Sequence, residues 1–289
     1  MRAFLKNAIL LLLILSLVIL PGCKKESFTP SVDGWTLTQR SDEQLCDGVT
    51  YTELLFMDES ALPHRAYVLT VSPKNVTLRK GTSQNGYEVM PQKRQTVMEH
   101  MQASVADGYN VIAAVNGDFF AISSTYMPTG LSIKDGTVLR ENNTFRPFSA
   151  YTVDGEYKIF SGTEKVDLHT LSMATGGSHV LLRNGQPDDV YQAGEFSTTP
   201  HPRTLSGVRA DKTMLFVVID GRQEKHSNGA TLLQCAQLMQ SLGATDAINH
   251  DGGGSSSMVL RTGDTYTTVN SPSDGHLRKV FCSIQITLK

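Results

Sequence analysis

The stretch VVIDGRQEKHSNGATLLQCAQLMQSLGATDAINHDGGGSSSMV, residues 217–259, alternates apolar runs with polar loops that contain glycine. It begins inside the run LFVVI, which is typical of a strand buried on both faces and ends at Asp220. Residues 229–243 predict a helix ended by Gly243. Its apolar face consists of Leu232, Leu233, Ala236, Met239 and Leu242. A short strand at 246–249 then leads into a glycine loop.

This loop, DGGGSSS at 251–257, contains more glycine than a turn requires. A turn needs one or two residues with positive φ, and each additional glycine costs backbone entropy on folding. A run of open N–H groups could instead bind an anion, with Ser hydroxyls beside it. The spacing matches neither a P-loop nor an EF-hand. We therefore expect a ligand to approach the backbone here.

Strand patterns dominate the rest of the chain. Runs rich in β-branched and aromatic residues occur at 49–57, 65–71, 75–80, 109–116 and 280–288. Hairpins are predicted at 131–139, 151–160 and 207–221. A helix is predicted at 96–108, where Thr96 and Glu99 form a capping box. Because strands outnumber helices, we expect one α+β domain over 35–289, with mixed β-sheets flanked by a few helices.

The N-terminus has the pattern of a secretion signal. A basic start precedes the apolar run 8–20, which is short for a membrane span. LPGC at 20–23 resembles the bacterial lipobox, in which Cys23 becomes the lipidated first residue; an ordinary signal peptide cut nearby is the alternative. We expect a signal peptide at 1–22, a tether at 23–34 and a lipid-anchored protein of the cell envelope, facing the periplasm or the exterior.

Composition excludes several function classes. The net charge is −2 and the domain has no Lys/Arg cluster, so we expect no nucleic-acid partner. The spacing of the three cysteines, Cys46, Cys235 and Cys282, is not that of a zinc site, and three are too few for a disulfide framework. The sequence does not exclude a single disulfide between two of them. The histidines show no H-E-x-x-H, and no G-x-S-x-G is present, which argues against zinc hydrolases and lipase-type triads.

Polar loops follow three of the predicted core strands. They contain Asn116-Gly117-Asp118, Asp220-Gly221-Arg222 and His250 to Ser255, and Arg203-Thr204 precedes another strand. Loops at the ends of core strands commonly build binding sites. Taken singly, Asn-Gly and Asp-Gly pairs are ordinary turn formers, and a lone arginine is more typical of a surface cation.

Together these segments resemble the phosphodiester glycosidase family, to which N-acetylglucosamine-1-phosphodiester α-N-acetylglucosaminidases belong. The matching pieces are AAVNGDFF (113–120), PTGLSIKDG (128–136), HPRTLSGV (201–208), the stretch 217–259 and Arg278. Their order and spacing hold over 110–289, while 35–100 matches only loosely. His250 departs from the pattern, in which an apolar or small residue precedes the Asp, and GDFF carries an extra acid.

The resemblance implies cleavage between a sugar's anomeric carbon and a phosphodiester, releasing free sugar and a phosphomonoester. Such cleavage passes through an oxocarbenium-like state that a carboxylate stabilises. Asp251 is the first candidate, Asp118 the second and Asp220 the third, a turn role for Asp220 being the other interpretation. The departing phosphate needs positive charge and N–H donors; Arg203, Arg278 and the 252–255 backbone would supply them.

The resemblance also implies a wider set of substrate-binding residues. This set consists of Asn116, Gly117, Gly130, Thr204, Arg222, Ser227, Gly252, Gly253, Gly254, Ser255, Ser256 and Arg278. His201 and His250 could act as acid or base, or be structural. The scheme requires no cofactor or metal, although an Asp-rich pocket could hold a divalent cation.

The expected partner is a phosphosugar or polysaccharide, with the membrane reached through the lipid anchor. Two other interpretations stay open. One is a non-catalytic, lipid-anchored glycan-binding or exopolysaccharide-processing accessory protein. The other is a phosphodiesterase that leaves the phosphate on the sugar.

Overall fold

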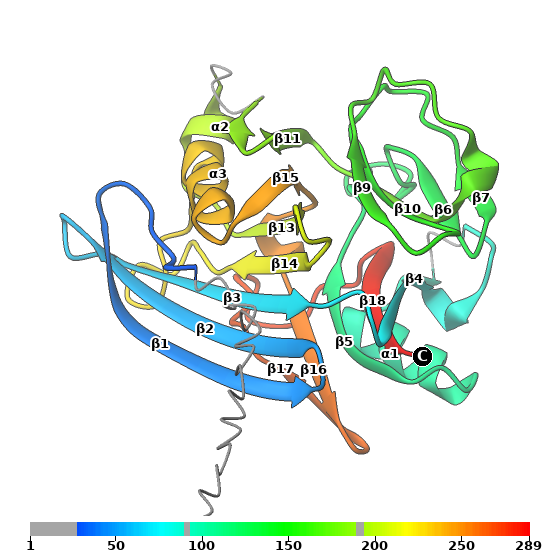
Figure 1. Ribbon diagram of the computed structural model, residues 1–289, viewed down its shortest axis with the longest axis horizontal. Helices are drawn as coiled ribbons and strands as arrows, with labels where there is room; N and C mark the ends of the chain where they lie inside the picture. Colours follow the sequence, from blue (N-terminus) through cyan, green and yellow to red (C-terminus); the bar gives the residue numbers. More distant parts are fainter. Residues whose placement is uncertain (1–27, 90–92, 189–193) are drawn as a thin grey trace, which may run out of the picture.

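The computed structural model describes residues 28–89, 93–188 and 194–289. The predicted signal peptide and Cys23 lie outside these residues. As predicted, the fold is α+β, with a few helices beside three sheets (Figure 1). The predicted mixed pairing is corrected: each described pair of strands runs antiparallel. Outside the hairpins, strand direction was not readable from the sequence, because long connections allow either arrangement.

The largest sheet has eight strands. Their spatial order is β1 (Trp35–Cys46), β2 (Val49–Asp58), β3 (Pro63–Val71), β14 (Met214–Ile219), β13 (Arg203–Arg209), β15 (Ala244–Asn249), β11 (His179–Arg183) and β12 (Gln186–Pro187). Strands far apart in the sequence therefore lie side by side: β3 pairs with β14, and β13 pairs with β15.

Two further sheets have five strands each. One is ordered β17 (Thr265–Thr268), β16 (Met258–Thr262), β5 (Val111–Asn116), β18 (Cys282–Leu288) and β4 (Val76–Thr82). The other is ordered β7 (Thr137–Arg140), β6 (Ser132–Lys134), β10 (Leu171–Gly176), β8 (Phe148–Thr152) and β9 (Tyr157–Phe160). In β6–β7, Asp135 and Gly136 have φ of 46° and 78°, as a tight hairpin turn requires.

The eight-stranded sheet is covered on both faces, which explains the uninterrupted apolar run of β14. Leu215, Val217 and Ile219 pack with the helix α3 (Leu232–Ser241). The alternating Phe216 and Val218 pack against the sheet of β4, β5, β16 and β18. Because successive side chains of a strand point to opposite faces, one strand serves two cores.

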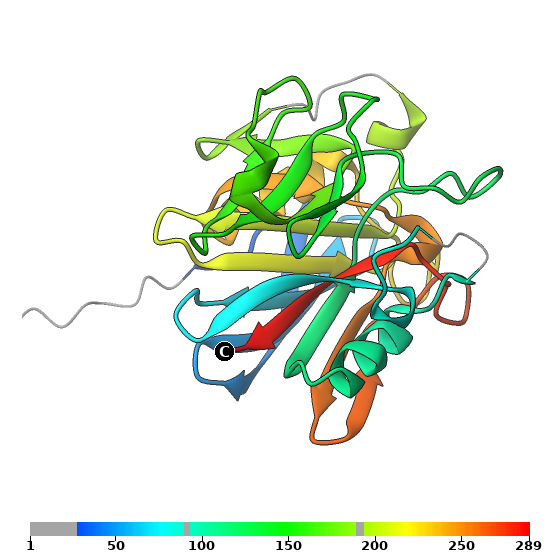
Figure 2. The ribbon, with the colours of Figure 1, turned by 90° about the vertical axis from the view of Figure 1, so that its right-hand side faces the viewer.

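Helices close the outer faces of this two-sheet stack. The helix α1 (Val97–Ala106) has the predicted Thr96–Glu99 capping box and packs on the far side of β5 and β18 (Figure 2). The helix α3 has a capping box of its own, between Thr231 and Gln234. Gly243 follows it with φ of 84°, which allows the chain to turn away. The short helix α2 (Glu195–Thr198) lies beside the start of β13.

The last part of the predicted tether is packed against the domain. Val32 is buried in the core around α3, and the guanidinium of Arg209 lies 4.2 Å from the centre of the Phe28 ring. Cys46, Cys235 and Cys282 are free thiols. None of the helices in the three described ranges has the length and apolarity to span a bilayer.

Candidate active site

The glycine loop crosses between two sheets. It leaves β15 of the eight-stranded sheet after Asn249 and enters β16 of the neighbouring sheet at Met258. Asn249 pairs with Leu205 of β13, and Met258 pairs with Val115 of β5. The end of β5, the start of β13 and the glycine loop therefore meet at one junction, and each carries one of the polar segments singled out in the sequence.

Asn116 links these three segments. Its amide nitrogen donates to the Asp251 carbonyl at 2.6 Å. Its amide oxygen accepts from the Thr204 hydroxyl at 2.7 Å and from the Ser257 N–H at 3.0 Å. Asn116 is fully buried, so each lost bond would leave an unpaired polar group. The predicted binding residues Asn116 and Thr204 thus hold the loop in place from beneath.

The glycines fit the loop into a space that side chains would fill. A Cβ on Gly252 would lie 2.6 Å from the Pro202 carbonyl oxygen, and Gly253 has φ of 61°. On the β5 side, the Gly117 carbonyl accepts from the Asp251 N–H at 3.1 Å, and a Cβ there would lie 2.8 Å from a sulfur atom, the Sγ of Cys282. Gly252 thus makes a close backbone contact, whereas Gly253 has positive φ and Gly117 faces a side chain.

The loop is less open to an anion than its sequence suggests. The N–H of Gly252 donates to the Asp251 carboxylate, that of Gly253 to the Pro202 carbonyl, and that of Ser255 to the Gly252 carbonyl. Residues 253–255 form a short 3₁₀ turn, η4 (Gly253–Ser255). Most of the predicted N–H donors are therefore used within the protein, and arginine side chains supply the positive charge around the loop.

The carboxyl of Asp251 has a strongly raised pKa. Removal from water raises its pKa to about 7, although the Ser255 hydroxyl, the charge of Arg278 and the Gly252 N–H oppose the shift. The residue stays partly exposed, and the Gly252 N–H lies 3.1 Å from its Oδ1. A carboxyl with this pKa changes charge near neutrality, which suits acid–base or nucleophilic chemistry.

Two predicted arginines border the loop. Arg278 donates to the Ser255 hydroxyl at 3.5 Å and is held by Asp274 at 2.8 Å. A Cβ on Gly254 would lie 2.1 Å from this guanidinium, so the glycine makes room for it. Arg222 is exposed and lies beside Gly253. Both side chains therefore present positive charge beside the glycine loop, and the charge of Arg278 acts on Asp251.

Arg146 is a third cation that sequence reasoning missed. Burial lowers the pKa of its guanidinium, and the charge of Asp251 opposes that shift, which places the two groups in electrostatic contact. Its guanidinium lies 5.2 Å from the centre of the Phe119 ring. The predicted Gly130 lies beneath it, where a Cβ would be 3.5 Å from the Cβ of Arg146 and 3.1 Å from Gly176. The segment 137–147 carries no motif that singles Arg146 out.

Arg203 was predicted to supply positive charge to the departing phosphate, but its guanidinium is engaged by backbone carbonyls away from the glycine loop. The side chain is 1% exposed and donates to the carbonyls of Ala230 at 2.9 Å, Phe196 at 2.6 Å and Thr199 at 3.2 Å. These bonds tie β13 to α2 and to the residue before the capping box of α3. Its visible role is to join elements around the site.

Asp118 is held in a buried ion pair. Its Oδ2 accepts from Lys80 Nζ at 2.6 Å, from the Ser132 hydroxyl at 2.8 Å and from the Cys282 thiol at 3.1 Å. Its Oδ1 accepts from the Gly176 N–H at 2.5 Å. Burial alone would lower the pKa of Lys80, but the Asp118 charge outweighs it and raises that pKa. Both carboxylate oxygens are engaged, and Cys282 takes part in this network as well as in the core beside α1.

Asp220 is engaged just as fully. Its carboxylate accepts from Tyr67 at 3.0 Å, His226 at 2.9 Å, the Asn270 amide at 2.8 Å and the Ser271 N–H at 2.8 Å. The Asn270 amide also donates to the Ser256 carbonyl, so this network supports the far end of the glycine loop. The predicted Ser227 donates to the Asp220 carbonyl at 2.6 Å and is fully buried.

The two candidate histidines differ in setting. His250 is fully buried, with its Nε2 at 2.7 Å from the Ser206 hydroxyl, and burial lowers its pKa to about 4. It is therefore neutral at pH 7 and structural in its contacts. His201 lies at the rim, 3.3 Å from the Arg222 guanidinium, and burial lowers its pKa as well. Among the described residues, no three His, Cys, Asp or Glu side chains converge as metal ligands would.

Solved structures share this fold. A hypothetical protein from Synechocystis superposes with a TM-score of 0.67 at 13% identity, over 89% of this chain and 68% of that one. The zebrafish N-acetylglucosamine-1-phosphodiester α-N-acetylglucosaminidase catalytic domain, auto-inhibited by its pro-peptide, superposes with a TM-score of 0.63 at 20% identity, over 92% of this chain and 86% of that one. At these identities the likeness establishes the fold.

Sequence comparison establishes the family. An uncharacterized SPbeta prophage-derived protein of Bacillus subtilis (strain 168), YomE, is 26% identical over 259 residues, which cover 80% of this chain and 38% of that protein. The chain thus spans less than half of that relative's length. The phosphodiester glycosidase family model matches residues 109–287, more than half of the chain and the whole of the junction described above. This chain belongs to the phosphodiester glycosidase family.

Proposed function

We propose that this protein hydrolyses the bond between the anomeric carbon of a sugar and a phosphodiester. Water adds to the anomeric carbon, the bond to the phosphate oxygen breaks, and the phosphate leaves with the bonding electrons. The products are a free reducing sugar and a phosphomonoester. The observation that carries the proposal is the Asp251 carboxyl, desolvated at the junction of two sheets and bordered by arginines.

Asp251 is the proposed catalytic carboxylate because the other two candidates are occupied. Asp118 is paired with Lys80, and the Asp220 carboxylate accepts four hydrogen bonds. In its ionised form Asp251 can stabilise positive charge at the anomeric carbon, add to it, or take a proton from water. Asp118 and Asp220 then act as positioning residues, the first behind Gly117 and the second behind Ser256.

The arginines are proposed to bind the phosphate. A phosphodiester needs less protonation on leaving than a sugar alcohol, but it gains negative charge that donors must stabilise. Arg278 and Arg222 border the 3₁₀ turn, and Arg146 approaches Asp251 from the Phe119 side. One guanidinium can donate two parallel hydrogen bonds to the oxygens of a phosphate, which would also orient the bond to be broken.

The products of a sugar-1-phosphate diester test this proposal against its alternatives. Free reducing sugar with a phosphomonoester supports the glycosidase. Sugar 1-phosphate would assign the cut to the other side of phosphorus and overturn the proposal. Measurable binding of the diester with no turnover would instead identify a non-catalytic glycan-binding protein.

We also propose, from residues 1–23 alone, a lipid anchor at Cys23 and a place in the cell envelope. Metabolic labelling with a fatty-acid analogue tests it. Label that is lost in a Cys23→Ser variant supports the anchor, and an unlabelled wild-type protein rejects it.

A further inference from the structure

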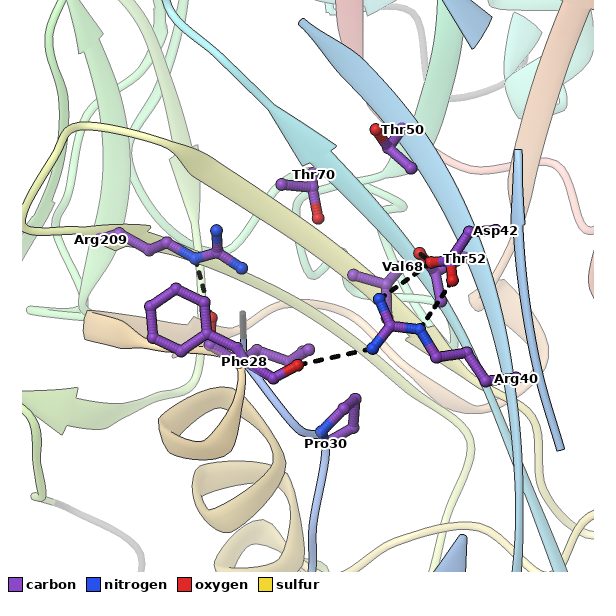
Figure 3. Close-up of a pocket in the computed structure, with 10 residues that line it drawn as sticks. Phe28, Pro30, Arg40, Asp42, Thr50, Thr52, Val68, Thr70 and Arg209 are labelled. Atoms are coloured by element: carbon purple, nitrogen blue, oxygen red, sulfur yellow. Dashed lines mark hydrogen bonds and ion pairs between the residues drawn. The ribbon is translucent and has the colours of Figure 1, made fainter. Parts of the chain in front are cut away.

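A cavity of about 200 Å³ lies away from the glycine loop, on the face of the eight-stranded sheet that α3 covers (Figure 3). It is lined by β1, β2 and β3, by Arg209 at the end of β13, and by Leu242 just after α3. Arg209 and Arg203 are the last and first residues of β13. At roughly 3.3 Å per residue, they are about 20 Å apart along the strand. The cavity is therefore separate from the junction around Asp251.

The sheet face changes character where α3 ends. The cross-strand pair Leu54 and Ala66 belongs to the apolar core under the helix. The next pairs along the same face are Thr52 with Val68 and Thr50 with Thr70. Hydroxyls thus replace apolar groups at the point where the helix stops covering the sheet. In Figure 3 the Thr70 hydroxyl points into the space between Arg209 and Arg40.

The rim offers donors and acceptors together. Arg40 and Asp42 form a two-bond ion pair at 2.8 and 3.0 Å, and the Thr52 hydroxyl donates to Asp42 at 2.7 Å. On the opposite side, Arg209 donates to the Leu242 carbonyl at 2.8 Å and covers the Phe28 ring. Charged groups of both signs, hydroxyls and an apolar floor at Val68 therefore surround one small space.

This combination selects for a particular ligand chemistry. The Asp42 carboxylate already engages the Arg40 guanidinium, so Arg40 and Arg209 do not form a paired cation site for an anion. A sugar hydroxyl can donate to a carboxylate and accept from a guanidinium or a threonine at the same time. The volume lies below the roughly 300–1,000 Å³ of sites for drug-sized ligands and suits one ring.

We propose that this cavity binds one neutral sugar ring. It is a second carbohydrate site, distinct from the junction that carries the proposed hydrolysis and independent of it. A ligand of about a dozen non-hydrogen atoms in a small polar cavity is expected to bind with a dissociation constant on the order of a few millimolar.

Methyl NMR of the full-length protein with glucose as probe tests the proposal, because the Val68 methyl groups form the cavity floor. We expect saturable shifts of Val68. Thr70→Val removes one hydroxyl at nearly constant shape and should weaken glucose binding about fivefold. The matched control is Thr265→Val, on the exposed strand β17, which should bind glucose as the wild type does.

Three results would overturn the proposal. They are no Val68 shift at saturating glucose in a folded wild-type protein, equal glucose affinity in Thr70→Val and wild type, and a Val68 shift with inorganic phosphate in place of glucose. As a second variant, Asp42→Asn should weaken glucose binding, whereas an anion site would bind phosphate more tightly after this change. None of these measurements depends on turnover.

Discussion

At the scale of single residues, the chemistry is concentrated in one carboxyl. Burial raises the pKa of Asp251, while a hydroxyl, an arginine and an N–H keep that rise in check. The same junction holds Asp118 and Asp220, whose oxygens are all engaged by other groups of the protein. Three similar side chains therefore have different tasks, and their hydrogen-bond partners decide which one is left for the substrate.

The pH dependence of turnover follows from the pKa of Asp251. If the ionised carboxylate acts, kcat/KM should rise with pH through about 7 and level off above it. Below that pH it should fall about tenfold per pH unit, because only the ionised fraction reacts. A pH–rate profile on a sugar-1-phosphate diester checks this. A rate that falls as pH rises through 7 would make Asp251 a general acid instead.

Arg278 should set the position of that midpoint. Its charge lowers the pKa of Asp251, so Arg278→Gln should move the midpoint above about 7 and should also weaken phosphate binding. Loss of one donor to the departing group typically costs on the order of 10²-fold in rate. Lys225→Gln, at an exposed position, is the matched control for loss of charge. An unchanged midpoint in Arg278→Gln would remove this arginine from the site.

At the scale of elements, the glycine loop connects β15 of one sheet to β16 of another and is closely packed against its neighbours. Asn116 fixes its start and its return to β16, and the Asp220–Asn270 pair supports its far end at Ser256. The glycines are there chiefly for contact with Pro202 and for the arginines beside them. The loop positions the Asp251 carboxyl, while the arginines carry the charge that the sequence suggested for the backbone.

Gly253 and Gly263 make a matched pair for testing this role. Their φ angles are 61° and 58°, but a Cβ on Gly253 would lie 3.1 Å from the Arg222 guanidinium, whereas a Cβ on Gly263 in the β16–β17 turn would meet nothing within 4 Å. Each alanine variant should cost about 1 kcal/mol in unfolding free energy, because both adopt left-handed backbone. Only Gly253→Ala should also lower turnover. Equal turnover in the two variants would show that the loop is structural.

At the scale of the whole molecule, the raised pKa of Asp251 has a thermodynamic consequence. The unfolded carboxyl ionises near 3.8 and the folded one near 7. Between these values the folded state binds more protons than the unfolded state, so this group makes the free energy of unfolding fall as pH rises. The loss of stability is complete above pH 7. Asp251→Asn should therefore gain about 1–4 kcal/mol in unfolding free energy at pH 8 and almost nothing at pH 4.

Denaturant unfolding of wild type and variant at both pH values measures this difference. Asp264→Asn, in the exposed β16–β17 turn, provides the control. A variant that is less stable than wild type at pH 8 would mean that the carboxylate is stabilised, not strained, at the junction.

The sequence predicted what local patterning controls and failed where distant segments meet. Apolar runs, Asp-Gly turns and capping residues located the main strands, both long helices and the junction residues Asn116, Gly117 and Asp251. Strand β1 was not predicted because its face is polar, and the prediction also omitted β10, β11, β16 and β17. Pairing direction depends on contacts between remote strands, such as β3 and β14. The orientation of the Arg203 side chain and the position of Arg146 near Asp251 depend on tertiary packing, which one sequence does not show.

The most direct test of the central claim is turnover by Asp251→Asn on a sugar-1-phosphate diester, with circular dichroism showing that the fold is intact. Asp264→Asn serves as the control for a lost carboxylate elsewhere. The account predicts that Asp251→Asn binds the diester but releases no free sugar, while Asp264→Asn releases it at the wild-type rate. A folded Asp251→Asn protein with full activity would contradict the assignment of Asp251 as the catalytic carboxylate.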